Sequence, residues 1–343
     1  MARLKKGFSS SEFPQRVTLQ DIAKVAGVHA VTVSDALNGT GRVAPATREK
    51  IVQLAKEMNY VPNLTARALA TGKTGRIGLL SGAFDYPYYA SVLQCLKHQL
   101  GETDYKLLLL HSSEEVRELV QATKNTEIDG VIAVDMYGLG EEFGEQSSIP
   151  CVSIGAYERA STDYVIVDLS AAVEEATNLM FEAGCQRIAY FVTSKYMAIP
   201  GESRARGYFA AMKRLGREPE IINVEISDRY LTPGLLATYI QEHGCPDGLM
   251  CQNDEIAMIA FRVLHDLGRR VPDDVLLVGC DGQLHMRYFV PSLSTIVQPL
   301  EEICATAWQF LRQRLSHPDI PRQKAALQGQ LIVGASLREH SRS

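Results

Sequence analysis

The sequence places polar and aromatic side chains directly after a short apolar run. The run RIGLLS is followed by FDYPYY, which contains Asp85, Tyr88 and Tyr89. If the run is a strand of a parallel sheet, these residues lie at its carboxyl end, where such sheets bind their ligands. Aromatic faces there suit a sugar ring or a base. The alternative is that they belong to a hydrophobic core or a subunit interface.

Motifs of the common catalytic sites are absent from the sequence. It contains no G-x-S-x-G, H-E-x-x-H, G-x-x-x-x-G-K-[ST] or G-x-G-x-x-G, and its eight His residues do not cluster. The glycines of Gly39–Arg42 lie between predicted helices, where they serve a turn. Carboxylates at strand ends are explained by binding a polyhydroxylated ligand. We therefore predict a protein that is not an enzyme and needs no cofactor or metal.

Short apolar runs alternate with amphipathic stretches from Arg76 onward. The runs are RIGLLS, KLLLLH, GVIAVD and PCVSIG, and then RIAYFV, GLMC and LLVGCD. Such a pattern is typical of parallel strands with helices on both faces. Because the set occurs twice, we predict an α/β body of two doubly wound lobes, approximately 75–165 and 166–294, joined near Tyr164–Asp168.

The charge is unevenly distributed. Residues 1–76 contain 12 Lys and Arg against five Asp and Glu, a net charge of +7, whereas the rest contains 23 against 35, a net charge of −12. A basic piece on an acidic body indicates a polyanionic partner for that piece. The alternative is an uneven solvated surface. Residues 1–16 are basic, Ser-rich and aperiodic, and we predict a mobile tail there.

The seven cysteines include no C-x-x-C pair, so neither a disulfide framework nor a zinc site is predicted. Buried reduced thiols in a cytoplasmic protein are expected instead. The N-terminal residues lack the apolar region of a signal peptide, and no apolar run reaches the roughly 20 residues that span a membrane.

Residues 17–61 have the pattern of a helix-turn-helix domain. Thr18 and Asp21 resemble a capping box at the start of a first helix, and Gly27 ends it. A second helix is predicted from about Ala30 to Leu37, and Pro45 opens a third. In such a domain the second helix enters the major groove of DNA.

Four segments carry a family resemblance: VTLQDIAKVAGV, TVSDALNG, VAPATREKI and NYVPNLTARALATGKT. In this order and spacing they resemble the LacI/GalR family of transcriptional regulators, and the resemblance continues to about Leu337. It implies a repressor that binds a partly palindromic DNA operator as a homodimer in the cytoplasm, associated with the nucleoid. A small-molecule effector, commonly a sugar or sugar derivative, switches operator affinity. The short polar end SLREHSRS lacks the leucine-rich extension of the family's tetramers.

The resemblance also implies a hinge helix, Asn63–Ala70, within a linker at 62–74. In the family a leucine of this helix inserts into the minor groove, and Leu69 has its position here. The alternative is that Leu69 packs on the body. The residues expected to contact DNA are Thr18, His29, Ala30, Val31, Thr32, Ser34, Asp35, Asn38, Arg48, Tyr60, Asn63, Ala66, Arg67 and Leu69.

The predicted recognition helix departs from the common family pattern S-x-x-T-V-S-R-V-L-N. His29 replaces the first Ser, and Asp35 replaces the Arg. A carboxylate accepts a hydrogen bond from cytosine N4 but cannot pair with guanine as Arg does. Ala30 and Val31 offer apolar contact to thymine methyl groups. We therefore predict an unusual operator, unless Asp35 pairs with a nearby cation and contacts no base.

In the body, which is predicted to span 75–338, family motifs indicate further ligand contacts. Asp168 matches V-x-x-D-N, although Leu169 replaces the Asn, and Arg204 matches R-x-x-G-[FY]. Asp254 either contacts the effector or caps the following helix. Arg229 and Tyr230 compete for the place of an aromatic residue. The expected effector contacts are Asp85, Tyr88, Tyr89, Asp168, Arg204, Arg229, Tyr230, Asn253, Asp254 and Asp281.

The resemblance implies that the chain returns between the lobes near Thr295–Pro299 and near 320–328. A second function is a ligand-binding protein of the periplasmic sugar-receptor type, which has no DNA-binding head. Salt-dependent binding to duplex DNA distinguishes the two. Whether the effector releases the protein from DNA or acts as a corepressor stays open.

Overall fold

The computed structural model describes residues 17–61, 72–82, 84, 86–101, 103–111, 128–136, 149–155, 162–225 and 229–337. The chain divides between Lys73 and Thr74 into two compact units, which we call the head and the core. Five residues with predicted roles, together with the predicted tail at 1–16, lie outside the described residues, and these roles stay predictions. The five are Asn63, Ala66, Arg67, Leu69 and Asp85.

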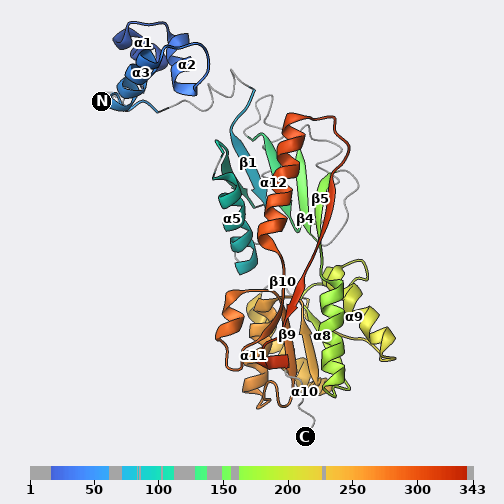
Figure 1. Ribbon diagram of the computed structural model, residues 1–343. Helices are drawn as coiled ribbons and strands as arrows, with labels where there is room; N and C mark the ends of the chain where they lie inside the picture. Colours follow the sequence, from blue (N-terminus) through green and yellow to red (C-terminus); the bar gives the residue numbers. More distant parts are fainter. Residues whose placement is uncertain are drawn as a thin grey trace, which may run out of the picture. The chain divides into compact units, whose positions relative to one another are not determined.

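Helices α1 (Leu19–Ala26), α2 (Ala30–Asn38) and α3 (Pro45–Glu57) form the head (Figure 1). The side-chain oxygen of Thr18 accepts from the backbone N–H of Asp21, and the Asp21 carboxylate accepts from the N–H of Thr18. The predicted capping box is therefore confirmed. Gly27 follows with φ 74°, a left-handed conformation that glycine adopts without strain, and so makes the turn between α1 and α2.

A small apolar core holds the head together. Ile22, Val33 and Ile51 come from α1, α2 and α3, and each is fully buried. Leu54 and Met58 pack against them, as the apolar spacing of α3 predicts.

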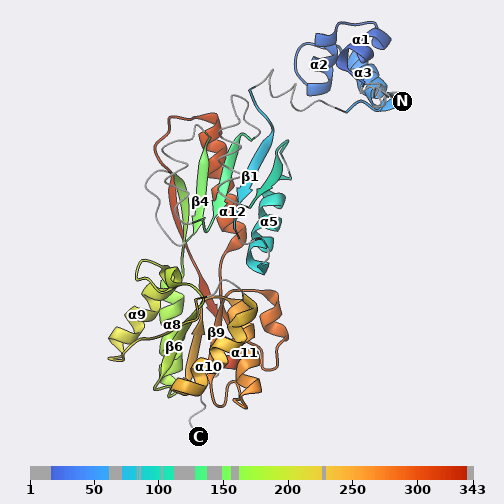
Figure 2. The same ribbon diagram turned by 180° about the vertical axis from the view of Figure 1, so that it is seen from behind.

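The first lobe of the core contains a parallel sheet with strand order β11-β5-β4-β3-β1-β2. Its strands are β1 (Arg76–Leu80), β2 (Lys106–Leu110), β3 (Gly130–Val134), β4 (Cys151–Gly155), β5 (Asp163–Asp168) and β11 (Lys324–Gln328). Helices α5 (Pro87–Leu100) and α12 (Leu300–Ser316) pack together. Figure 1 shows α12 in front of this sheet, and Figure 2 shows the strands in front of α12.

The second lobe contains a sheet with strand order β12-β10-β9-β8-β6-β7. Its strands are β6 (Ile188–Val192), β7 (Glu220–Asn223), β8 (Gly248–Cys251), β9 (Leu276–Asp281), β10 (Ser294–Val297) and β12 (Gln330–Ile332). Its longer helices are α8 (Ser170–Glu182), α9 (Ser203–Arg214), α10 (Thr232–His243) and α11 (Asp254–Asp266). The short strands β7, β10 and β12 were not among the predicted apolar runs, and β12 pairs antiparallel with β10.

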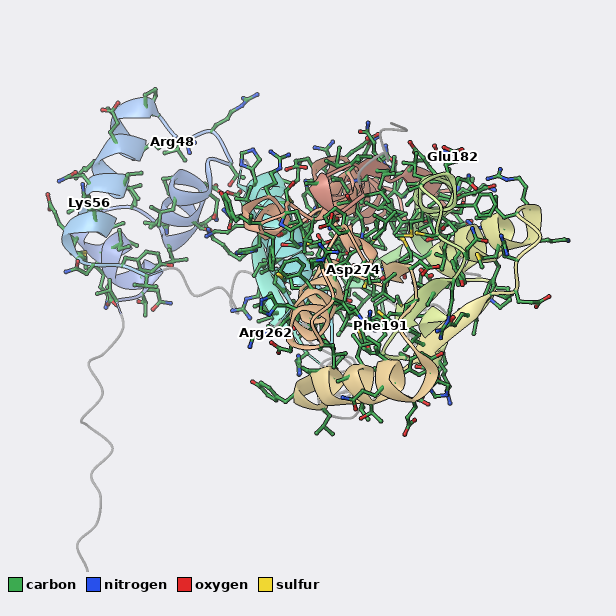
Figure 3. All side chains as sticks on the ribbon, turned by 90° about the horizontal axis from the view of Figure 1, so that it is seen from below. Arg48, Lys56, Glu182, Phe191, Arg262 and Asp274 are labelled. Atoms are coloured by element: carbon green, nitrogen blue, oxygen red, sulfur yellow. The ribbon has the colours of Figure 1, made fainter. Side chains whose placement is uncertain are left out.

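Alternating side chains bury both faces of each sheet. In β6, Tyr190 packs among residues of α8 and α9, whereas the next residue, Phe191, packs among residues of α10 and α11. Figure 3 shows Phe191 inside the second lobe and Arg262 at its edge. Successive strand residues point to opposite faces, so two faces covered by helices require continuous apolar runs. The predicted pair of doubly wound lobes is confirmed.

The chain passes between the two sheets three times. It runs from β5 to α8, from β10 to α12, and from β11 through Gly329 to β12. A single apolar cluster continues across the lobes, because Leu79, Ile154, Tyr190 and Val278 all belong to it. The lobes are therefore tied by backbone and by packed side chains.

A buried ion pair anchors α12 to the first sheet. Arg314 Nε and Nη2 donate to the two carboxylate oxygens of Asp163 at 3.0 and 2.8 Å, with side chains only 18% and 1% exposed. The backbone N–H of Gln323, just before β11, donates to the same carboxylate at 2.7 Å. The carboxylate at the start of β5 thus holds the end of α12 and the start of β11 together.

We predict that Arg314→Leu lowers the free energy of unfolding of the core by about 3–5 kcal/mol, because Asp163 is left buried without its cation. Arg312→Leu, an exposed site on the same helix, should change it by less than about 0.5 kcal/mol. Urea unfolding followed by the fluorescence of Trp308, the single Trp of the chain, measures both. Equal losses in the two variants would contradict the assigned role of the pair.

Candidate functional site

Helix α2 and its N-cap His29 carry seven of the fourteen residues that were predicted to contact DNA, and all seven are exposed or partly exposed. Val31 is 71% exposed, and His29 and Asn38 are also exposed. Ala30, Thr32, Ser34 and Asp35 are partly exposed. An exposed valine near the start of a helix suits the predicted contact with a thymine methyl group, which stays a prediction.

Arg48 begins on α3 but turns its guanidinium to the end of α2. It donates to the backbone oxygens of Ala36 at 2.9 Å, Asp35 at 3.3 Å and Thr40 at 3.3 Å. The last carbonyls of a helix have no partner within the helix, so a basic side chain stabilises them. Arg48 was predicted to contact DNA. In the head itself, its guanidinium positions the end of α2.

Asp35 is held within the segment that joins α2 to α3. Its carboxylate accepts from Thr40 Oγ1 at 3.2 Å and lies against Gly41, where an added Cβ would approach Asp35 Oδ2 to 2.5 Å. Gly41 also has φ 67°, so glycine is required there for two reasons. Among the described residues, no cation forms an ion pair with Asp35.

Thr18 and Tyr60, the other described head residues with predicted DNA contacts, have different surroundings. Thr18 is exposed and its hydroxyl donates to Asp21 at 2.7 Å within the capping box. Tyr60 is partly buried and packs against the head core.

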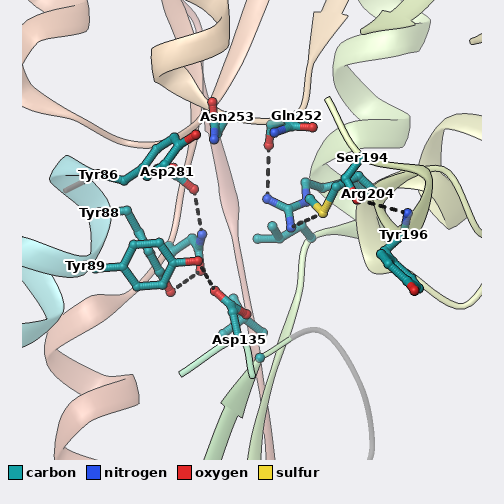
Figure 4. A pocket seen from close by; sticks show the side chains of 15 residues that line it. Tyr86, Tyr88, Tyr89, Asp135, Ser194, Tyr196, Arg204, Gln252, Asn253 and Asp281 are labelled. Carbon is teal, nitrogen blue, oxygen red and sulfur yellow. Dashed lines mark hydrogen bonds between the residues drawn. The ribbon is translucent and has the colours of Figure 1, made fainter. Parts of the chain in front are cut away.

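A cavity of about 280 Å³ lies between the two lobes of the core (Figure 4). Its lining comes from the carboxyl ends of strands, from α5, and from the segments that cross between the lobes. The lining residues are Tyr86, Tyr88, Tyr89, Asp135, Gly155, Val167, Leu169, Ser194, Tyr196, Met197, Arg204, Gln252, Asn253, Asp281 and Gln298.

The cavity brings together half of the ten predicted ligand residues, namely Tyr88, Tyr89, Arg204, Asn253 and Asp281. Polar lining residues that the sequence analysis did not select are Tyr86, Asp135, Ser194, Tyr196, Gln252 and Gln298. One signal was available, because Asp135 ends the apolar run GVIAVD just as Asp281 ends LLVGCD.

Gln298 connects the lobes across the cavity. The hydroxyl of Tyr88, on α5, donates to Gln298 Oε1 at 3.1 Å, and Gln298 Nε2 donates to Asp281 Oδ1 at 2.9 Å. Beside it, the hydroxyl of Tyr89 donates to Asp135 Oδ2 at 3.2 Å. Burial and the nearby carboxylates raise the pKa of both tyrosines, so they stay protonated donors.

Arg204 faces these residues from the second lobe (Figure 4). Its Nε donates to Glu202 Oε1 at 2.9 Å, and its Nη1 donates to the backbone oxygen of Gln252 at 3.0 Å. The Glu202 side chain is completely buried, and it also accepts from backbone N–H groups at the start of α9. Burial alone would lower the pKa of Arg204, but Glu202 and the other acidic groups around it together outweigh burial, so the pKa is raised and the group stays charged.

Asp135 and Asp281 enter the cavity from strained backbone. Their φ values are 50° and 119°, in the region that favours glycine, and they follow or end β3 and β9. Such strain persists only where the surroundings hold it, and it concentrates at functional sites. Burial, together with the carboxylate of Asp254, raises the pKa of Asp281 well above its usual range.

Asp254 does not line the cavity. It is fully buried, accepting from Thr295 Oγ1 and from the backbone N–H of Gln283, both at 2.6 Å. The alternative role predicted for Asp254, capping the following helix, is wrong. Asn253 caps α11, because its Oδ1 accepts from the backbone N–H of Ile256. Asp254 supports the segment that follows Asp281.

Asp168 and Tyr230 also lie outside the lining. Asp168 accepts from the hydroxyl of Ser170 at 2.7 Å and from Arg206 at 2.8 Å. Tyr230 is 81% exposed on the short 3-10 helix η2 (Arg229–Leu231). Arg229 begins that helix, and its side chain is not among those described.

The chain's seven cysteines are free thiols, and the described residues contain no group that could hold a metal ion. No helix within the described ranges is long and apolar enough to cross a membrane.

Comparison with known proteins identifies the family. The model of bacterial regulatory proteins, lacI family, matches residues 18–63, and that of the periplasmic binding protein-like domain matches residues 177–337. The ribose operon repressor of Halalkalibacterium halodurans is 30% identical over 322 residues, covering 92% of this chain and 96% of the relative. The chain belongs to the lacI family.

Solved structures agree with this assignment. The lac repressor dimer bound to operator and the anti-inducer ONPF has a TM-score of 0.81 at 20% identity, covering 94% of this chain and 99% of that chain. The complex of the transcriptional regulator CelR with cellobiose has a TM-score of 0.67 at 25% identity, covering 94% and 100%. This lacI-family protein is thus a DNA-binding regulator with an effector-binding core, and the resemblance seen in its sequence is confirmed.

We predict that Asp254 makes core stability depend on pH. Burial raises its pKa from 3.8 to about 7, so its stabilising effect is complete below pH 3.8 and is lost as pH rises to about 7. Asp254→Asn should flatten the fall in the free energy of unfolding across this window. The exposed variant Asp273→Asn should keep the wild-type slope. Urea unfolding at a series of pH values measures the free energy of unfolding of each protein. If this free energy fell with pH equally steeply in Asp254→Asn and in the wild type, the prediction would be contradicted.

Proposed function

We propose that this protein is a cytoplasmic, nucleoid-associated repressor that binds an operator through α2 and responds to a small effector in the cavity between its lobes. One observation carries the proposal: the same chain joins a helix-turn-helix head to a bilobed core with a polar, aromatic cavity. Binding explains the polar lining without catalysis, so we propose that the protein is not an enzyme.

The proposed effector is a sugar or sugar derivative. Tyrosine rings offer flat faces to a sugar ring, and carboxylates and amides accept and donate hydrogen bonds to its hydroxyl groups. The CelR complex with cellobiose supports this class. The proposed contacts are Tyr86, Tyr88, Tyr89, Asp135, Arg204, Asn253 and Asp281.

We propose a homodimer on a partly palindromic operator, since a two-fold protein requires two half-sites. An exposed apolar surface suits the subunit contact. Leu284, Tyr288 and Val290 are 59%, 71% and 92% exposed on and beside the short 3-10 helix η3 (Leu284–Tyr288). Such neighbouring apolar side chains favour burial against a second copy.

The effector acts, in this proposal, by binding two arrangements of the lobes unequally. A ligand shifts an equilibrium only through different affinities for its two states. The Tyr88–Gln298–Asp281 hydrogen bonds join the lobes beside the ligand, so a ligand that displaces Gln298 changes how the lobes are held. The predicted hinge at 62–74 would transmit this change to the head.

The experiment selects a duplex from a randomised pool and measures its affinity by fluorescence anisotropy. The logarithm of the affinity should fall linearly with the logarithm of salt concentration. Hexoses and pentoses are then titrated, and one of them should change operator affinity at least tenfold. Equal affinity for the selected duplex and a scrambled one would contradict the repressor and favour a ligand-binding protein without DNA function.

We further predict that Asp35→Asn and Asp35→Ala relax base preference at one position of each half-site, at a cost of about 1–3 kcal/mol. The control is Thr40→Ala, which removes the hydrogen bond to Asp35 but keeps the carboxylate. Selection from randomised duplexes measures the preference. If all three variants keep it at every position, Asp35 stabilises the loop and reads no base.

A further inference from the structure

The cavity is lined by apolar side chains at the end of β5 and by polar side chains at the ends of other strands. Resting on the proposed function, we propose that the effector is a 6-deoxyhexose, a single-ring sugar with a methyl group in place of its outermost hydroxyl. The methyl group contacts Leu169, which is thereby a specificity-determining residue. A hexose with the complete set of hydroxyl groups binds more weakly.

Three strands of the core bring their last residues to the cavity in different ways. Asp135 follows β3 and Asp281 ends β9, and both line the cavity. Asp168 ends β5, but its carboxylate is turned to side chains outside the lining. Val167 and Leu169 line the cavity in its place. The end of β5 therefore offers a ligand methyl groups where the other two strands offer carboxylate oxygens.

Leu169 is held in this wall by close packing. It is buried in the same apolar cluster as Val167, and Met197, another residue of the lining, packs against that cluster. An added Cβ on Gly329 would approach Leu169 Cδ2 to 2.4 Å, so the crossing from β11 to β12 lies directly against the leucine. A hydroxyl group placed beside these side chains gives up its hydrogen bonds to water and gains none in return, which disfavours binding.

The leucine stands at a position where a polar residue would suit the helix better. Leu169 is the N-cap of α8 and makes no side-chain hydrogen bond to the first turn. Asn, Asp, Ser and Thr are preferred there, because their side-chain oxygen accepts from a backbone N–H. The motif V-x-x-D-N, which the sequence otherwise matches, has Asn at this place. Positions that break such a local rule are expected at functional sites.

The rest of the lining suits the other hydroxyl groups of one sugar ring. Asp135, Asn253 and Asp281 supply polar side chains, and Tyr86 and Tyr196 supply flat aromatic faces. The volume of about 280 Å³ lies below the roughly 300–1,000 Å³ typical of small-molecule sites, which favours one ring over two. A single ring with polar edges and one apolar edge matches this lining.

The test measures the binding of matched sugars to the full chain by titration calorimetry. The pairs are L-fucose with L-galactose, L-rhamnose with L-mannose, and 6-deoxy-D-glucose with D-glucose. The two sugars of each pair differ only in the hydroxyl group at C6. At least one deoxy sugar should bind about 10- to 100-fold more tightly than its partner, the discrimination that an apolar pocket achieves against an added hydroxyl.

A gain-of-function variant tests the role of Leu169. Leu169→Asn should reverse the preference within that pair, because the amide can pair with the added hydroxyl. The substitution also supplies a cap for α8, so the variant is expected to fold. Ala171→Asn adds the same amide at an exposed site in the first turn of α8 and should keep the wild-type preference.

Three results would overturn the inference: a hexose that binds as tightly as its deoxy partner in every pair, no binding by any of the six sugars, or an unchanged preference in Leu169→Asn. The wild-type comparison needs no variant, so it stands even if a variant misfolds. Operator affinity is measured on the same preparation without sugar. Selective operator binding together with any of the three results contradicts the deoxy sugar and leaves the repressor proposal intact.

Discussion

The core is constrained by three chain crossings that leave its sheets at the carboxyl ends of β5, β10 and β11. Parallel strands present their ligand-binding residues at this end. The constraint therefore places the cavity, the crossing segments and the bridging residue Gln298 together. Three connections also restrict the lobes to movements that bend all of them at once, as in hinge closure. In the proposed function, ligand binding and lobe movement would thus depend on the same few residues.

Buried charge is the second organising feature. Glu202 joins the start of α9 to Arg204, and Asp254 joins the loop after Asp281 to Thr295. Such groups are stable only when their partners stay in place, because an unpaired buried charge costs several kcal/mol. The charged side chains beside the cavity are therefore held in place by their partners, whereas the tyrosines and Gln298 of the cavity wall are neutral. A ligand must match this electrostatic pattern to bind.

The head depends less on apolar burial for its stability than the core does, because so small a domain buries little apolar surface. Its helices are stabilised by the capping box of α1 and by basic side chains turned inward: Arg48 donates to carbonyl oxygens at the end of α2, and Lys50 donates to the Ala26 oxygen at 3.2 Å. Basic residues whose spacing predicts phosphate contacts therefore form hydrogen bonds inside the head instead. Val31 on α2 and His29 at its N-cap remain exposed, and we propose that this end of the helix contacts DNA.

The sequence alone determined the family, the helix-turn-helix, the capping box at Thr18 and the two doubly wound lobes, because periodicity, caps and continuous apolar runs are local. It also selected five of the cavity residues. Only the tertiary structure separated Asp281, in the lining, from Asp254 beneath it, and turned Asp168 toward Ser170 and Arg206. It added Asp135 and Gln298 as well. Which strand-end side chain reaches a cavity depends on strand order, register and the approach of the second lobe, and these are not encoded in any local pattern.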